Sequence, residues 1–465
     1  MNEKRVHIES FGCQMNKLDT ALVSAALQRA GFTLSDNVDG SDIVLINTCS
    51  VREHAEEKVF SHLGFLRHIK EARPNLIVGI IGCMAQRLGN ELLEHEAVDI
   101  VCGPNRIPTI CELVTEALEK KNKTLAVTGN IRQASAQNPA LEDFESVYDR
   151  ADKRIPGQAY VRVMRGCDKF CSYCIVPYVR GPEVSRPPEK INEQIKRLAG
   201  EGVKQVMLLG QTINSYEYTA GEKAYNLADI LAMVSDVDGI EWIKFVTSYP
   251  TRKNYDKILQ AIAVLPKVCR YLHLPAQSGS DKILRAMNRK YTSQEYLELL
   301  EAARDTVTGI TTAGDFIVGF PSETQEDFEA TVSLVKRAQY KNCFVFKYSP
   351  RPGTIGDKKL QDNVPWDVKK KRNTELLAVQ EKISDELSNQ FLGRTVTVLV
   401  EGLSKKPHIN TDAGSDRPQL VGRTAADWIA VFNGPISLAG HFAKVKITKT
   451  SPLTLFGELV NEVRR

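Results

Sequence analysis

Strand-like and helix-like segments alternate along the first 120 residues of the chain. Three runs fit buried strands, and they lie at 5–10, 43–51 and 76–83. Two amphipathic runs with helical spacing separate them, at 17–31 and 53–72. The first closes at Gly31 and the second stops before Pro74, both ordinary helix ends. The alternation predicts an α/β domain over residues 1–120, built on a doubly wound parallel sheet.

The same rhythm returns, with longer helices, between residues 154 and 390. Six runs fit buried strands, at 160–164, 206–211, 243–248, 271–277, 314–320 and 343–349. All but the last are followed by a helical stretch, which predicts a partial (β/α)6 barrel with its chemistry at the carboxyl ends of the strands. The preceding segment 121–153 is polar and has no sustained period, so we expect it to be a linker.

The last part of the chain changes to period-two alternation. A charged helical run at 366–390 leads into it. The alternating segments are broken by Gly, Pro and Asn, and they lie at 394–404, 420–432 and 442–460. They predict a small antiparallel β-barrel over residues 391–457. The chain's net charge of +4 lies entirely in residues 391–465, which hold 10 Lys and Arg against 6 Asp and Glu. That charge fits a phosphate-bearing partner, and a solvated face explains it equally well.

Composition describes an ordinary globular protein, with 42% hydrophobic and 25% charged residues. No apolar run approaches the roughly 20 residues needed to span a bilayer. The N-terminus MNEKRVHIES carries charges and no apolar core. We therefore expect no secretory signal, no membrane partner, a cytoplasmic location and reduced thiols. The phosphate-loop motif G-x4-G-K-[ST] is absent from the sequence, which argues against use of ATP.

Three of the 10 cysteines crowd into RGCDKFCSYCIVP, as Cys167, Cys171 and Cys174. A structural zinc site normally has four N or S ligands, and the next candidates downstream are far along the chain. An iron-sulfur cubane is normally held by four thiolates. Three thiols on one short loop would leave one iron open to bind a substrate. We therefore favour a 4Fe-4S cluster over zinc at this loop.

A second set of three cysteines lies in the N-terminal domain, as Cys13, Cys49 and Cys83. Each closes a predicted strand, so a parallel sheet would bring all three to one edge. Cys13 and Cys83 directly follow glycines, which lets a bulky ligand approach. The alternative is that each is simply a small buried hydrophobe. Their equivalent positions favour a ligand set.

Together these features resemble the radical S-adenosylmethionine (SAM) methylthiotransferases. The C-x3-C-x2-C loop resembles the radical SAM signature, and the terminal barrel resembles the TRAM domain of that family. The motifs that carry the resemblance are FGCQMNKLDT, NTCSVREHAEEKVF, RGCDKFCSYCIVPYVRGPEVSR, LLGQTINSY, HLPAQSGS and DFIVGFPSET. They cover nearly the whole chain. The stretch Gln14-Met15-Asn16 distinguishes it from the branch that modifies ribosomal protein S12, which usually reads Pro-Lys-Asn there.

The resemblance implies a reaction and its cofactors. It implies two 4Fe-4S clusters, one on each cysteine triplet, and two SAM molecules per turnover. It implies insertion of a methylthio group at carbon-2 of isopentenyl (dimethylallyl) adenosine in the tRNA anticodon stem-loop, next to the anticodon. An electron donor of the flavodoxin or ferredoxin type is also implied, and we expect a monomer. The alternatives are a methylthiotransferase acting on threonylcarbamoyladenosine tRNA or on ribosomal protein S12, and a non-enzymatic iron-sulfur RNA-binding sensor.

Further site residues are expected around the two clusters, and no catalytic residue is assigned beyond the cluster ligands. The candidates for contact with SAM or the base lie at predicted strand ends or beside the loop, namely Tyr173, Gln211, Asn214, Gln277, Ser278 and Gly319. Core packing and satisfied loop hydrogen bonds are the alternatives. The candidates for RNA contact are Arg165, Lys169, Arg180, Arg186, Arg394 and Arg423. Each of these could equally belong to a surface ion pair.

Overall fold

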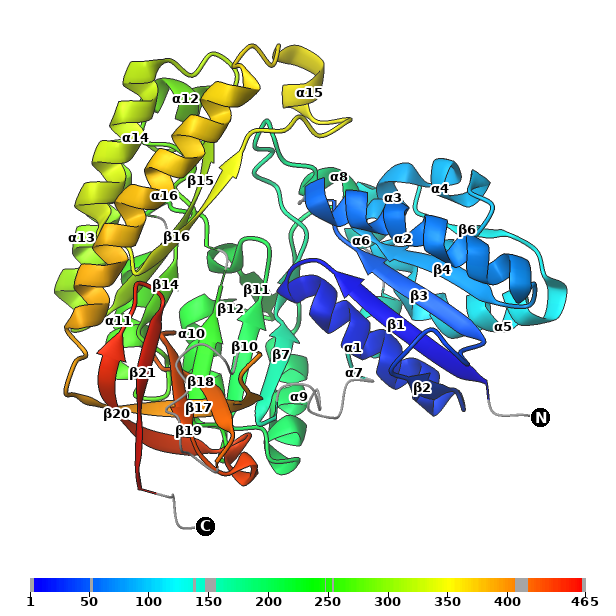
Figure 1. Ribbon diagram of the computed structural model, residues 1–465, viewed down its shortest axis with the longest axis horizontal. Helices are drawn as coiled ribbons and strands as arrows, with labels where there is room; N and C mark the ends of the chain where they lie inside the picture. Colours follow the sequence, from blue (N-terminus) through cyan, green and yellow to red (C-terminus); the bar gives the residue numbers. More distant parts are fainter. Residues whose placement is uncertain are drawn as a thin grey trace.

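The computed structural model describes residues 4–50, 53–136, 139–146, 156–246, 248–252, 255–405 and 417–461. Three regions follow one another along the chain: an N-terminal α/β domain, a central open barrel and a small C-terminal β-barrel (Figure 1). The predicted fold class is confirmed in all three. Among the described helices, none is long and apolar enough to cross a membrane.

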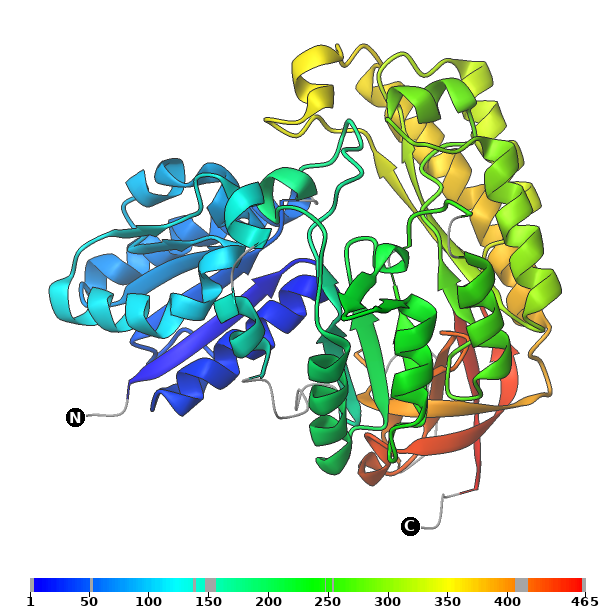
Figure 2. The same cartoon turned by 180° about the vertical axis from the view of Figure 1, so that it is seen from behind.

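The N-terminal domain is a six-stranded, fully parallel sheet in the order β2-β1-β3-β4-β5-β6. Successive strand residues point to opposite faces, so Ile43 and Leu45 pack on one core while Val44 and Ile46 pack on the other. Both faces therefore carry helices, as in Figure 2. The strands are β1 (Arg5–Phe11), β2 (Thr33–Ser35), β3 (Ile43–Thr48), β4 (Ile77–Gly82), β5 (Ile100–Cys102) and β6 (Thr124–Ala126). The helices are α1 (Gln14–Arg29), α2 (Glu53–Ala72), α3 (Cys83–Leu88), α4 (Asn90–Glu94), η1 (Pro104–Thr109) and α5 (Ile110–Lys120).

The segment predicted to be a linker is more ordered than its polarity suggested. Its first part forms β6, the edge strand of the N-terminal sheet, and two short helices follow, α6 (Ile131–Ala136) and α7 (Pro139–Ser146). Phe144 of α7 is buried in the main core. These elements are too short for a period to show in the sequence, and tertiary contacts hold them. Residues 137–138 and 147–153 of the expected linker lie outside the described residues.

The central region is an open barrel of six parallel strands, arranged as two three-stranded sheets. One sheet has the order β13-β10-β7 and the other β14-β15-β16, and a bridge between Ile243 and Val268 lies at their junction. Helices α13, α14 and α16 cover the outer face of the second sheet (Figure 1). The strands are β7 (Gln158–Arg162), β10 (Gln205–Leu209), β13 (Trp242–Phe245), β14 (Tyr271–His273), β15 (Thr311–Val318) and β16 (Asn342–Lys347).

Shorter elements complete the central region. Two strand pairs that the sequence analysis did not anticipate lie on its loops, β8 (Met164–Arg165) with β9 (Val184–Ser185), and β11 (Glu217–Ala220) with β12 (Lys223–Asn226). The helices are α8 (Val176–Val179), α9 (Pro188–Gly200), η2 (Ile213–Ser215), α10 (Leu227–Ser235), α11 (Tyr255–Val264), α12 (Asp281–Ala286), α13 (Ser293–Thr306), α14 (Gln325–Ala338), α15 (Ile355–Lys359) and α16 (Trp366–Asn389).

The C-terminal region closes into a five-stranded barrel in the order β17-β18-β19-β21-β20. It differs from the prediction in one pairing, because β19 and β21 run parallel. The barrel packs against the amino ends of the central strands, where Asp427 pairs with Lys244 at 3.1 Å and with Lys341 at 3.3 Å. Its elements are β17 (Thr395–Leu403), β18 (Gln419–Thr424), β19 (Ile429–Asn433), η3 (Ile436–Leu438), β20 (Phe442–Thr450) and β21 (Thr454–Asn461).

Candidate cluster and substrate site

The sheet register brings the N-terminal cysteines to one edge. Phe11 of β1 lies opposite Thr48 of β3, and Thr48 lies opposite Gly82 of β4. Cys49 and Cys83 directly follow the last two, and Cys13 caps α1 two residues after Phe11. The three cysteines therefore leave the sheet at the same level on neighbouring strands.

The surroundings of this triplet leave no room for larger residues. A Cβ added at Gly12 would lie 2.7 Å from Asn16 Oδ1 and 2.9 Å from the Cβ of Cys49. Asn16 is itself fixed, because its amide donates to Asn47 Oδ1 at 3.0 Å and to the Thr48 carbonyl at 2.8 Å. The Cys13 thiol donates to Asn16 Oδ1 at 3.2 Å. The site is thus a narrow, braced cradle for three thiols.

The pKa values of two cysteines in the N-terminal triplet shift in opposite directions. A hydrogen bond with Cys49, helped by the nearby charge of Arg180, lowers the pKa of Cys13 to about 5. Burial instead raises the pKa of Cys83, against the opposing effect of Arg180. The lowered pKa favours the thiolate of Cys13, the form that binds metal.

The second triplet lies on the loop between β8 and α8. The Cys167 amide donates to the Gly181 carbonyl at 3.1 Å, and the Ser172 amide donates to the Met287 carbonyl at 3.0 Å. Gly166 has φ +73°, and a Cβ there would overlap the Pro182 carbonyl. Burial raises the pKa of Cys167 to about 11 and also raises the pKa of Cys174. Metal binding at this loop therefore has to displace protons.

A fixed cation stands beside this loop. Arg289 is buried, and its Nη1 donates to Cys171 Sγ at 3.4 Å. Its other nitrogens are anchored, by Tyr291 Oη at 2.6 Å and by the Pro275 carbonyl at 2.6 Å. The guanidinium also lies 4.5 Å from the ring centroid of Tyr249. No pattern in the sequence signals Arg289, which is more than a hundred residues away along the chain.

One cysteine of the N-terminal triplet contacts the short helix that follows the second triplet. Cys83 packs with Ile175 and Val179, which flank and end α8, directly after the second triplet. Arg180 then turns back, donating from Nε to Cys83 Sγ at 3.1 Å and from Nη2 to Asp19 Oδ2 at 2.8 Å. The same Asp19 accepts a hydrogen bond from Arg162 of β7. The N-terminal domain is thus tied to the barrel through buried charges next to both triplets.

Each triplet offers three thiols, the donor type that holds iron-sulfur clusters. Among the described residues, no three Cys, His, Asp or Glu side chains form a ready site for one metal ion. Cys13, Cys49 and Cys83 would hold one such cluster, and the loop cysteines the other.

Most arginines expected to contact RNA lie inside the protein. Arg180 and Arg186 are 6% and 2% exposed, and Arg186 pairs with Glu142 at 2.7 Å. Asp19 and the partly buried Glu142 occupy their guanidinium groups, which leaves neither one open to the RNA expected from the sequence. Arg165 is also buried, which lowers its pKa to about 10, and its Nε and Nη1 have no hydrogen-bond partner. A buried unpaired cation of this kind is suited to an anionic ligand.

The remaining RNA candidates lie nearer the surface. Lys169 is partly exposed and pairs with Glu183 at 3.3 Å. Arg394 is exposed at the start of the C-terminal barrel. Arg423 lies at the junction between the two barrels, where it pairs with Asp427 at 3.1 Å and Glu401 at 3.2 Å. Of the six, Arg394 presents its charge most freely.

Some of the side chains expected near SAM already have hydrogen-bond partners within the protein, and one does not. Asn214 is occupied, because it exchanges two hydrogen bonds with the backbone of Tyr249, at 2.7 and 2.8 Å. Ser278 accepts from the Ser280 amide at 3.1 Å and contacts the Thr331 hydroxyl at 3.3 Å. Gln211 keeps a buried Oε1 with no hydrogen-bond partner. Gln211 is therefore the amide acceptor most available to a ligand.

Tyr173, Gln277 and Gly319 shape the rim of the site. Tyr173 packs beside Phe320 and Tyr348. Gln277 has φ +73° and bridges to β15 through its backbone.

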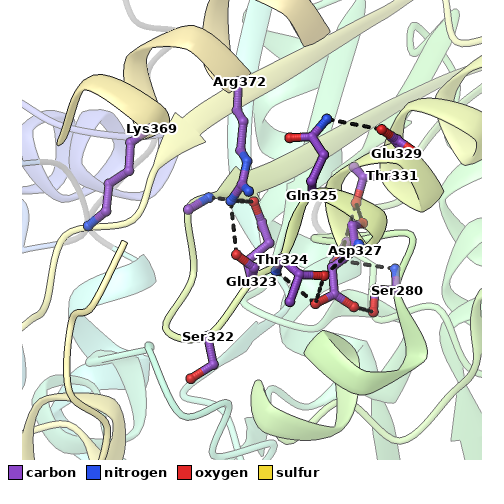
Figure 3. Close-up of polar contacts among 12 residues, drawn as sticks. Ser280, Ser322, Glu323, Thr324, Gln325, Asp327, Glu329, Thr331, Lys369 and Arg372 are labelled. Atoms are coloured by element: carbon purple, nitrogen blue, oxygen red, sulfur yellow. Dashed lines mark hydrogen bonds and ion pairs between the residues drawn. The ribbon is translucent and has the colours of Figure 1, made fainter. Parts of the chain in front are cut away.

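Gly319 donates its amide to Glu323 Oε1 at 2.9 Å, and Arg372 of α16 reaches the same carboxylate at 2.8 Å. Figure 3 shows Arg372 directed at Glu323, with Ser280 and Asp327 joined beside them. These hydrogen bonds fix the backbone of the turn at Gly319.

Comparisons with known proteins assign the three regions to described families. Residues 161–335 match the radical SAM superfamily, residues 5–103 match the uncharacterized protein family UPF0004, and residues 389–460 match the TRAM domain. Among solved structures, the radical SAM methyltransferase TsrM from Kitasatospora setae has a similar fold, with a TM-score of 0.54 at 16% identity over 76% of this chain and 77% of TsrM. The fold and the cysteine loop therefore define a radical SAM enzyme.

Closer relatives identify the branch. A tRNA-2-methylthio-N(6)-dimethylallyladenosine synthase from Rhodopirellula baltica is 42% identical over 98% of this chain and 95% of its own length. One from Bacteroides fragilis is 39% identical over 99% of this chain and 96% of its own. The chain belongs to the tRNA-2-methylthio-N(6)-dimethylallyladenosine synthase family, which confirms the predicted resemblance.

Proposed function

We propose that the chain inserts a methylthio group at carbon-2 of N6-isopentenyl (dimethylallyl) adenosine, next to the anticodon of tRNA. The relatives that match this chain over nearly their whole length are named for that activity. The hydrogen at carbon-2 sits on an aromatic ring and is neither acidic nor easily lost as hydride, so its removal calls for a radical. The observation that supports the proposal is the packing of Cys83 against Ile175 and Val179, which follow the second cysteine triplet along the chain.

Membership of the radical SAM superfamily implies a 4Fe-4S cluster and SAM. Cys167, Cys171 and Cys174 would hold that cluster, which would supply one electron for cleavage of SAM into methionine and a 5'-deoxyadenosyl radical. We further propose that Cys13, Cys49 and Cys83 hold a second 4Fe-4S cluster at which sulfur is delivered. Two SAM molecules are then used in each turnover, one as methyl donor and one as radical source.

The chain's own residues orient and shield these groups. Arg289 places a fixed N–H donor and a positive charge against the Cys171 sulfur. The unpartnered Gln211 Oε1 offers an acceptor to a donor group of SAM or the base. Asp19, bonded to Arg162 and Arg180, keeps the N-terminal domain against the barrel, which excludes water from the space where a radical would form.

The C-terminal barrel presents a basic face for the RNA backbone. Along β20, Lys444 and Lys446 point outward, while the alternating Ala443 and Val445 are buried in the barrel core. On the neighbouring strand β17, Thr395 lies opposite Lys446, so Arg394, the residue before Thr395, lies close to these lysines. A row of exposed cations on a small barrel favours phosphate contacts without base specificity.

Three further expectations complete the proposal. A one-electron donor of the flavodoxin or ferredoxin type reduces the enzyme, because the chemistry starts with one electron. The tRNA substrate would place the enzyme in the cytoplasm. We expect the chain to act as a monomer, since both cysteine triplets come from one chain.

Mass spectrometry of hydrolysed tRNA from a deletion strain tests the proposed function. The strain should lose 2-methylthio-N6-isopentenyladenosine and accumulate N6-isopentenyladenosine, and a plasmid copy of the gene should restore the modified form. Unchanged methylthio content in tRNA would overturn the proposal. Loss of a methylthio group from ribosomal protein S12 instead would assign the chain to the alternative branch.

A further inference from the structure

The last barrel strand, β16, exposes two aromatic rings. Cys343 and Val345 belong to the hydrophobic core, whereas the alternating Phe344 and Phe346 are 52% and 41% exposed. Their rings are nearly parallel, with an interplanar angle of 21° and centroids 6.5 Å apart. Large apolar side chains exposed as a pair in this way mark a binding surface more often than chance exposure does.

The sheet register shows which side of the strand the rings occupy. Phe344 lies opposite Asp315 of β15, and Phe346 lies opposite Ile317. Phe316, between those two, packs on Tyr340 on the side covered by the helices. The two phenylalanine rings therefore face away from the outer helices, toward the concave side of the open barrel.

That concave surface is continuous with the radical SAM loop. Ile317, the register partner of Phe346, packs with Tyr348 in the same small cluster as Tyr173 of the loop. The loop is also held near the end of this strand, because the Gly356 amide donates to the Ser172 carbonyl at 2.6 Å. Phe346 thus lies beside Ile317, which packs in the same cluster as Tyr173, a residue of the cysteine loop.

The chain that leaves β16 is strongly basic. Residues 347–371 contain seven Lys or Arg against three Asp and no Glu. Lys369 is buried and pairs with Asp362 at 2.7 Å, so the exposed lysines of this segment are Lys358, Lys359, Lys370 and Lys371. Exposed aromatic rings beside excess positive charge form the usual surface for single-stranded nucleic acid, in which bases stack and phosphates pair with cations.

We propose that Phe344 and Phe346 form a stacking platform for an unpaired base of the RNA substrate, with the exposed lysines of segment 347–371 holding the adjoining phosphates. The inference rests on the proposed function for the identity of the RNA, an anticodon loop. It adds a contact surface inside the barrel opening to the phosphate contacts of the C-terminal barrel. An apolar protein partner fits less well, because the excess of cations would remain unpaired against it.

Binding of a synthetic anticodon stem-loop that carries isopentenyladenosine tests this platform. Fluorescence anisotropy with the reconstituted enzyme at fixed salt, without SAM, should show about tenfold weaker binding for the Phe344→Ala/Phe346→Ala variant. The Phe344→Leu/Phe346→Leu variant should stay weak, because leucine keeps the apolar surface and lacks a ring face. Phe65→Ala, at a ring that is also 52% exposed but lies on α2, should bind like the wild type.

Two results would overturn the platform. One is wild-type affinity in the double alanine variant, which would assign this surface to another partner; the other is full recovery in the double leucine variant, which would indicate simple apolar contact. Duplex RNA without a loop controls for folding and should bind all variants equally. The measurement does not depend on turnover, so loss of stem-loop affinity in an enzyme that forms no methylthio product would support the platform and reject the proposed reaction.

Discussion

The two cysteine triplets are built in opposite ways. Cys167, Cys171 and Cys174 lie on one loop, where burial raises the pKa of Cys167 to about 11. The N-terminal three come from three parallel strands, and there a hydrogen bond with Cys49 and the charge of Arg180 lower the pKa of Cys13 to about 5. Burial therefore favours the protonated thiol at Cys167, whereas the lowered pKa favours the thiolate at Cys13.

The two sites therefore depend to different degrees on the rest of the fold. The loop triplet needs only a short turn and the backbone hydrogen bonds that hold it to Gly181 and Met287. The N-terminal triplet needs the sheet register, and its charge balance needs Arg180, which the barrel domain contributes. Assembly of the N-terminal site is therefore coupled to docking of the two domains.

The largest expected effect comes from removing a single thiol at each site. Cys171→Ala should abolish both SAM cleavage and methylthio transfer, since it damages the radical source. Cys13→Ala should abolish transfer and spare SAM cleavage, with iron content falling by about four per chain. Chromatography of 5'-deoxyadenosine and of modified nucleosides measures both activities. Product from the Cys13→Ala variant would show that the N-terminal triplet is not a ligand set.

The pH dependence of thiol reactivity should separate the triplets by several pH units. In iron-free protein, the lowered pKa of Cys13 means that its thiolate forms as the pH rises past about 5. The raised pKa of Cys167 means that its thiolate forms only as the pH rises toward about 11. Alkylation rates followed by peptide mass spectrometry give both midpoints, because only the thiolate reacts. Coincident midpoints would contradict the contrast.

Arg180 should stabilise both the contact between the N-terminal domain and the barrel and the thiolate form of Cys13. Arg180→Gln should destabilise the protein by about 3 kcal/mol, because it breaks a buried ion pair, and it should also raise the alkylation midpoint of Cys13. Arg180→Lys should recover part of both effects. Lys120→Gln removes only an exposed pair with Glu116 and should leave the stability nearly unchanged. Thermal unfolding measures the stabilities, and an unmoved Cys13 midpoint would reduce Arg180 to a structural role.

The smallest effect is expected from one added methyl group at the N-terminal cradle. Gly12→Ala should cost about 1–3 kcal/mol, because its Cβ would crowd Asn16 and Cys49. Gly64→Ala on α2 meets nothing within 4 Å and should stabilise the helix by about 0.5–1 kcal/mol. Denaturant unfolding compares the two variants. Equal stabilities would mean that the cradle is looser than its contacts indicate.

The sequence predicted long, periodic elements well and short ones poorly. The six barrel strands and α16 follow clear patterns, and the structure has them. The elements β6, α6 and α7 were assigned to a linker, because segments of three to eight residues are too short to show a period. The parallel β19–β21 pairing was also missed, since alternation reveals a strand without revealing the direction of its partner.

The candidate site shows the same limit. Cysteine identity and spacing indicated both triplets, but the roles of the cations were misjudged. Arg180 and Arg186 looked like RNA contacts because sequence alone shows charge and hides burial. Arg289 gave no signal at all, since its contact with Cys171 joins segments far apart in the chain.

The sequence by itself determined which atoms this protein can offer to iron and the family to which it belongs, because thiol spacing and local periodicity are properties of neighbouring residues. Only the tertiary structure decided which cations face those thiols and which rings remain open to a substrate. Those relations depend on sheet register and domain docking, which bring distant residues within hydrogen-bond reach and set the local exposure to water.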